Sequence, residues 1–316
     1  MKERRRKSAF HSRTISSLIV VTACGGLLLI MTTAMGTQTL NKVITWGGNT
    51  ADWNRALHLG GLRLGCSDPP SGCVNYAQQE SKSQGVDKVF LAILLNKDKT
   101  PAYADEFSRL SQTHSFLYEV GFDDFVSQCQ RQKLGFSDLS ALLNEVSRNL
   151  KSANPNLHLG ITLYEDELTS MRFPIRNLDE NFRKSVDFVH LYPHYRKEAQ
   201  SFSTSVQQSK ELFPDAKIIP GVYAYDRRDY LPCASGSSKP CSNQEELSLF
   251  AQSLKERLAM LGDSGVGWIE FYPGSFGLEA HWDKWNEPRI CRPERVQECI
   301  DNTRKMHEMV RQDLNP

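Results

Sequence analysis

Short apolar runs and amphipathic segments alternate along the chain from residue 43 onward. Seven runs have the nearly continuous apolar character of parallel strands covered on both faces: 43–46, 89–95, 115–120, 157–164, 187–192, 217–225 and 266–272. Between them, apolar residues recur at helical spacing over 139–150 and 247–261, and we expect a last helix over 293–312. The helix over 247–261 follows Ser242 and Glu245, which form a capping box.

This alternation predicts an α/β fold, either a (β/α)8 TIM barrel or a doubly wound sheet. No glycine-rich phosphate loop follows any predicted strand, which argues against a nucleotide-binding sheet. Polar and aromatic residues instead collect at the carboxyl ends of several strands, where TIM barrels keep their active sites. We therefore predict a TIM barrel, with an eighth strand that is either irregular, near 61–64, or missing.

Alternation within each strand predicts which side chains face the barrel interior. In 157–163 the odd positions are aliphatic and should pack under the helices, so His158, Gly160 and Thr162 should point inward. In 115–120 the same test places Tyr118 outward and Glu119 inward.

Three strands then place an acid near the carboxyl end of the inner face: Glu119, Asp166 and Glu270, with Glu165 beside the second. These four acids are the predicted catalytic residues. The predicted substrate-binding residues around them are Tyr164, His190, Tyr192, His194, Tyr223, Tyr225, Asp226 and Tyr272.

Two carboxylates across a cleft serve glycoside hydrolysis, and aromatic side chains give sugar rings flat apolar faces to lie against. The chain resembles TIM-barrel glycoside hydrolases in Leu163-Tyr164-Glu165-Asp166-Glu167 after a middle strand and in Trp268-Ile269-Glu270-Phe271-Tyr272-Pro273-Gly274 at a late one. The resemblance implies a carbohydrate substrate, a carboxylate pair as catalyst and no cofactor.

Two other functions stay open. Neither an Asn-Glu dipeptide at a strand end nor a D-x-x-D-x-D-x-E run occurs, as expected for a barrel that binds carbohydrate or cell envelope without catalysis. A metal-dependent hydrolase is the other alternative, with His190 and His194 as ligands beside Asp226 or Asp166.

The N-terminus predicts export. Six Lys or Arg residues precede an apolar segment over 15–35, long enough to cross a bilayer, and no charge occurs between Arg13 and Lys42. We expect residues 1–36 to form a basic cytoplasmic tail with a membrane-spanning signal anchor or a cleaved signal peptide, and residues 37–316 to form one extracytoplasmic domain, membrane-anchored or secreted. Without residues 1–36 the formal net charge falls from +1 to −4, which argues against nucleic-acid binding.

Cysteine spacing fits an oxidising compartment. Six cysteines form three close pairs, which predicts three local disulfides: Cys66–Cys73, Cys233–Cys241 and Cys291–Cys299. Zinc binding is the weaker alternative, because no C-x-x-C occurs. Cys129 is expected to be a buried thiol on a helix.

Overall fold

The computed structural model describes residues 43–47, 59–195, 202–227, 239, 241–261, 267–272 and 293–314. Contacts divide the chain into two units, Met1–Gln38 and Thr39–Pro316, and all described residues belong to the second. In this part of the chain, no helix combines the length and apolar character needed to cross a membrane. The apolar segment predicted to do so, over 15–35, lies outside the described residues.

Eight parallel strands close into a barrel in sequence order, which confirms the predicted TIM barrel. The strands are β1 (Val43–Trp46), β2 (Leu59–Cys66), β3 (Val89–Ile93), β4 (Leu117–Phe122), β5 (His158–Tyr164), β6 (Phe188–Tyr192), β7 (Lys217–Tyr223) and β8 (Ile269–Tyr272). The eighth strand is present as β2, at the place where an irregular strand was expected near 61–64: it pairs with both β1 and β3, and its register with β1 shifts between Val43 and Ile44.

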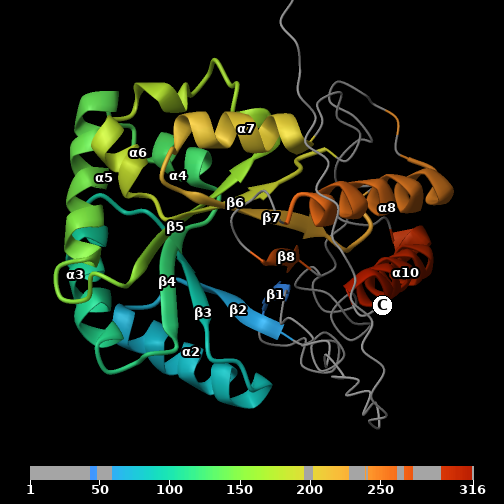
Figure 1. The fold of residues 1–316 in the computed structure, drawn as a ribbon, viewed down its shortest axis with the longest axis horizontal. Helices are drawn as coiled ribbons and strands as arrows, with labels where there is room; N and C mark the ends of the chain where they lie inside the picture. Colours follow the sequence, from blue (N-terminus) through green and yellow to red (C-terminus); the bar gives the residue numbers. More distant parts are fainter. Residues whose placement is uncertain are drawn as a thin grey trace, which may run out of the picture. The chain divides into compact units, whose positions relative to one another are not determined.

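Helices surround the strands, with α2, α3 and α5 on one side of the barrel and α7, α8 and α10 on another (Figure 1). The helices are α2 (Pro70–Gln84), α3 (Thr100–Ser111), α4 (Phe125–Arg131), α5 (Phe136–Leu150), α6 (Glu180–Ser185), α7 (Phe202–Leu212), α8 (Asn243–Ala259) and α10 (Val296–Leu314). Short 3-10 turns cover Glu165–Glu167 (η2), Ile175–Asn177 (η3) and Pro293–Arg295 (η4). The predicted cap of α8 is present, since Ser242 Oγ accepts a hydrogen bond from the backbone N–H of Glu245.

The barrel interior has three layers. At the amino ends of the strands lies an apolar layer formed by Ile44, Phe90, Tyr118, Phe188, Ile219 and Trp268. Charged side chains fill the middle, and aromatic residues surround the opening at the carboxyl ends. The layers follow from alternation, since every second residue of a strand points inward.

Tyr118 corrects one predicted orientation. It was expected to point outward, yet its ring lies 5.3 Å from that of Phe90 and 5.9 Å from that of Trp268, inside the barrel. The pairing of β3 with β4 shifts at this point, so that Val89 aligns with Leu117 but Phe90 with Glu119. The irregularity leaves Tyr118 and Glu119 both on the inner side, which strict alternation does not allow.

The Cys66–Cys73 disulfide joins the end of β2 to the first turn of α2, as predicted. Cys241 and Cys299 are disulfide-bonded as well. Their predicted partners, Cys233 and Cys291, lie outside the described residues. Cys129 is a buried free thiol on α4, which confirms that prediction.

Candidate functional site

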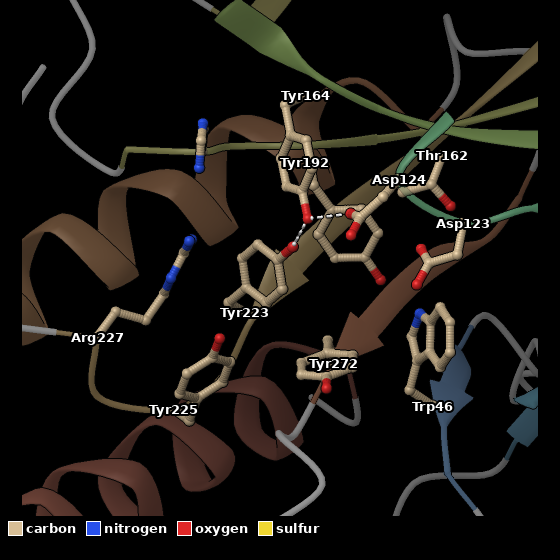
Figure 2. A pocket seen from close by; sticks show the side chains of 11 residues that line it. Trp46, Asp123, Asp124, Thr162, Tyr164, Tyr192, Tyr223, Tyr225, Arg227 and Tyr272 are labelled. Atoms are coloured by element: carbon tan, nitrogen blue, oxygen red, sulfur yellow. Dashed lines mark hydrogen bonds between the residues drawn. The ribbon is translucent and has the colours of Figure 1, made fainter. Parts of the chain in front are cut away.

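A pocket opens among the carboxyl ends of the barrel strands. It has a volume of about 190 Å³, and we call it the mouth pocket. Its described lining residues are Trp46, Asp123, Asp124, Thr162, Tyr164, Tyr192, His194, Tyr223, Tyr225, Arg227 and Tyr272 (Figure 2). Six of the eleven are aromatic residues other than histidine, five of them tyrosines, so flat rings line the pocket together with hydroxyl and charged groups.

The aromatic walls are packed against one another. The ring of Tyr223 lies 4.7 Å from that of Tyr192 and 5.4 Å from that of Tyr272, and Trp46 meets Tyr272 edge-on at 5.6 Å. Such contacts fix ring orientations before a ligand arrives. The pocket therefore presents a preformed set of flat faces.

A chain of hydrogen bonds ties one wall to an acid. The hydroxyl of Tyr223 donates to that of Tyr164 at 3.0 Å, and Tyr164 donates to Asp124 Oδ1 at 2.9 Å (Figure 2). Burial, with the nearby charge of Asp124, raises the pKa of Tyr164, so its hydroxyl stays a proton donor. Asp124 also has a positive φ of 43°, a conformation that costs a non-glycine residue energy and often marks a functional site.

Asp123 is the second acid of the pocket. Burial raises the pKa of its carboxyl above the ordinary value, even though the positive charge of Arg63 opposes the shift. The direction of this shift favours the protonated form more than in an ordinary aspartate. Asp123 and Asp124 were not among the predicted site residues, because the fourth strand was expected to end at Val120 rather than Phe122.

Directly beneath the pocket lies a charged cluster that no solvent reaches: Arg63, Glu119, His190 and Glu270. His190 Nε2 lies 2.9 Å from Glu119, and its Nδ1 contacts Glu270. Arg63 Nη1 lies 3.4 Å from Glu270 and 3.9 Å from Glu119. As strand alternation predicts, both acids and the histidine point into the barrel.

Three of the four groups, Arg63, His190 and Glu270, have pKa values shifted toward the charged form. Burial favours the neutral form of Glu270, but Arg63 and His190 outweigh it and lower its pKa to about 2. Burial and Arg63 likewise oppose protonation of His190, yet Glu119 and Glu270 prevail and raise its pKa. Glu270 therefore has no proton to donate near neutral pH.

The charged cluster is connected to the pocket above it. Arg63 Nη2 donates to Thr162 Oγ1 at 2.6 Å, and Thr162 lines the pocket. The Arg63 guanidinium also lies 5.0 Å from the centre of the Trp46 ring. The cluster thus forms the floor that positions Thr162 and Trp46.

The other predicted acids lie elsewhere. Glu165 is buried, where it pairs with Arg257 and accepts a hydrogen bond from Ser205 at 2.9 Å. Asp166 is exposed and lies 3.2 Å from His194.

Asp226 is buried and accepts a hydrogen bond from Asn302 at 3.1 Å. None of Glu119, Glu165, Asp166, His190, Asp226 or Glu270 is among the described lining residues. The predicted residues that do line the pocket are Tyr164, Tyr192, His194, Tyr223, Tyr225 and Tyr272.

The described residues contain no group of three or more His, Cys, Asp or Glu side chains placed to hold a metal ion. Both ring nitrogens of His190 face carboxylates, and His194 faces Asp166, so the two histidines do not converge. The metal-site alternative finds no support in this part of the chain.

No protein-family model and no curated protein sequence matches the chain. Solved structures do share its fold. A glucosidase from Croceicoccus marinus matches with a TM-score of 0.54 at 13% identity, over 87% of this chain and 68% of its own. The exo-β-1,4-mannosidase Op5Man5 from Opitutaceae bacterium strain TAV5 matches with a TM-score of 0.51 at 6% identity, over 85% and 60%. A structure from a study of two fungal β-1,4-galactanases matches with a TM-score of 0.50 at 11% identity, over 68% of this chain and 77% of its own. The chain therefore has a TIM-barrel fold like that of glycoside hydrolases.

Proposed function

We propose that this chain is a carbohydrate-processing barrel that binds a sugar in the mouth pocket and hydrolyses a glycosidic bond there. The observation that carries the proposal is the pocket itself, where preformed aromatic walls and two acids meet at the carboxyl ends of the strands. Aromatic faces suit sugar rings, and carboxyl groups supply the acid and base of glycoside hydrolysis.

We assign the proton-donor role to Asp123. Its carboxyl lines the pocket, and burial raises its pKa in the direction that a general acid needs. Asp124, held by the hydroxyl of Tyr164, is the second carboxylate and acts as base or nucleophile. Glu270 acts indirectly, by fixing Arg63 under the pocket, and Glu119 acts in the same way through His190.

A second candidate is a barrel that binds carbohydrate without cleaving it. One observation favours it. Glu270, the acid of the last strand, is ion-paired with Arg63 and His190 and is not among the described lining residues of the pocket. This candidate shares the pocket and the sugar but gives Asp123 no role in bond cleavage.

Turnover and binding of an oligosaccharide panel separate the two candidates. We expect Asp123→Asn to lower turnover by about a hundredfold or more, while the dissociation constant changes far less. Asp138→Asn, an exposed acid on α5, is the matched control and should keep full activity. Turnover that survives in a folded Asp123→Asn protein would overturn its assignment as acid. Binding without turnover in the unmodified protein would establish the second candidate.

We also propose that the domain works outside the cytoplasm, either anchored or released by the N-terminal segment. The disulfide between Cys66 and Cys73 and the bonded state of Cys241 and Cys299 support this, since such bonds persist in oxidising compartments. Protease treatment of intact cells is the test. A domain protected until the membrane is broken would contradict the proposal.

A further inference from the structure

Arg227 follows β7 by four residues and is one of the lining residues of the mouth pocket. It is only 5% exposed. Its guanidinium lies 4.1 Å from the centre of the Tyr223 ring, and its Nη1 donates to the backbone carbonyl of Pro193 at 3.0 Å. These contacts hold the side chain in one place.

Among the described residues, Arg227 has no carboxylate partner, unlike the other two deeply buried arginines. Arg63 pairs with Glu270, and Arg257 pairs with Glu165. No carboxylate among the described residues lies within ion-pair distance of the Arg227 guanidinium, and its Nε is buried without a hydrogen-bond partner there. Glu246 accepts a hydrogen bond from Arg227, but from the backbone N–H.

A buried cation without an anionic partner is unfavourable, because an aromatic face and one carbonyl replace only part of its hydration. Stability alone would favour an uncharged residue at this position. A ligand that brings a negative group into the pocket would supply the missing partner, and a guanidinium can hold a carboxylate through two parallel hydrogen bonds.

The charges of the pocket are separated in space. Figure 2 shows Arg227 on one side of the Tyr223 ring and Asp123 with Trp46 on the other. One end of the pocket is therefore acidic and the other basic. A ligand that fills it needs an anionic group at the Arg227 end and an uncharged bond to be cleaved at the Asp123 end.

We propose that Arg227 binds the carboxylate of a sugar acid, so that the ligand of this barrel is a glycan that contains hexuronic acid. This inference rests on the proposed function and narrows its substrate class. Arg227 is then a specificity-determining residue of the pocket.

The test is a glycan array in which each hexuronic-acid glycan has a neutral counterpart and a sulfated counterpart of the same linkage. We expect hexuronic-acid members to bind at least tenfold more tightly than their neutral counterparts. Arg227→Gln should reduce this ratio below twofold, and Arg227→Lys, which keeps the charge but not the two-pronged geometry, should give an intermediate ratio. Arg109→Gln, an exposed arginine on α3, removes the same charge and should leave the ratio unchanged.

Each other outcome has a defined meaning. Equal binding of neutral and acidic counterparts by the unmodified protein overturns the role of Arg227 but leaves the sugar-binding function standing. A preference for sulfate esters over carboxylates overturns the assignment to hexuronic acid. A preference that persists in Arg227→Gln places the anion site elsewhere. Binding of no glycan at all overturns the proposed function itself. The comparison within the unmodified protein does not depend on whether the variants fold.

Discussion

Arg63 on β2 and Glu270 on β8 form an ion pair inside the barrel, with Nη1 3.4 Å from Oε2, although 207 residues separate them in the chain. Both side chains are fully buried. The pair joins the strands on either side of β1. It belongs to the buried charged cluster that also contains His190 and Glu119. Its main effect is therefore on the stability and shape of the pocket floor.

Removal of one partner should leave a buried charge uncompensated. We expect Glu270→Gln to lower the free energy of unfolding by about 3–5 kcal/mol, measured by urea denaturation. The control is Glu180→Gln, which removes an exposed pair with Lys184 and should change stability far less, because solvent screens such pairs. A Glu270→Gln protein as stable as the parent would show that Arg63 does not need the charge of Glu270 as its partner.

Acid should weaken the same cluster. The pKa of Glu270 is lowered from 4.5 to about 2 in the folded protein, so its contribution is present above pH 4.5 and is lost as the pH falls toward 2. The shift corresponds to about 3 kcal/mol. Denaturation at several pH values between 2 and 5 should show a steep loss in the parent and a shallower one in Glu270→Gln.

His190 should give the opposite pH dependence of stability, with a loss as the pH rises. Its pKa is raised above 6.5 in the fold, so its contribution is complete below pH 6.5 and is lost as the pH rises through the raised value. Imidazole NMR signals of His190 should therefore report a protonated ring at pH 6. A neutral ring at pH 6 would contradict the assignment of charges in the cluster.

Gly160 on β5 leaves room for the cluster. A methyl group at this position would overlap the carboxylate of Glu119. We expect Gly160→Ala to cost about 1–3 kcal/mol of stability, as overpacking in a tight core does, and to move Glu119 away from His190. Gly267→Ala, where a methyl group meets nothing within 4 Å, is the matched control in thermal unfolding. Equal melting temperatures would mean that Glu119 shifts without loss.

The sequence was sufficient for the barrel and for much of its inner face. Aliphatic alternation in β5 and the apolar character of most strands are direct consequences of helices packed outside the barrel. The eighth strand was predicted only as irregular or missing near 61–64, because β2 contains Gly60, Gly61 and Arg63, which interrupt its apolar run. From the sequence alone, a lone arginine such as Arg63 is expected at the surface. Its burial opposite Glu270 becomes evident only in the closed barrel.

The site was harder to predict for the same reason. Inward orientation of Glu270 and His190 follows from alternation, but whether an inward acid is free or paired depends on strands far apart in the chain. Asp123 and Asp124 could have been found from the Phe122-Asp123-Asp124 segment at a strand end, had the fourth strand been extended by two residues. The pairing of Glu165 with Arg257 needs the packing of α8 against the barrel, which no local pattern contains.

The Cys66–Cys73 disulfide closes a short loop between β2 and α2. We expect Cys66→Ser to lower the free energy of unfolding by about 2 kcal/mol. Mass spectrometry of non-reduced protein should also link Cys241 to Cys233 and Cys299 to Cys291. Free thiols at these positions in protein made by its own cells would contradict both the pairing and the proposed compartment.

The central claim is that a sugar occupies the mouth pocket, and a crystal structure of the protein with a bound oligosaccharide tests it most directly. We predict a sugar ring against Trp46 and Tyr272, with a glycosidic oxygen within hydrogen-bond distance of the Asp123 carboxyl. An oligosaccharide that binds in solution but lies on another surface of the barrel, with the mouth pocket empty, would contradict the account.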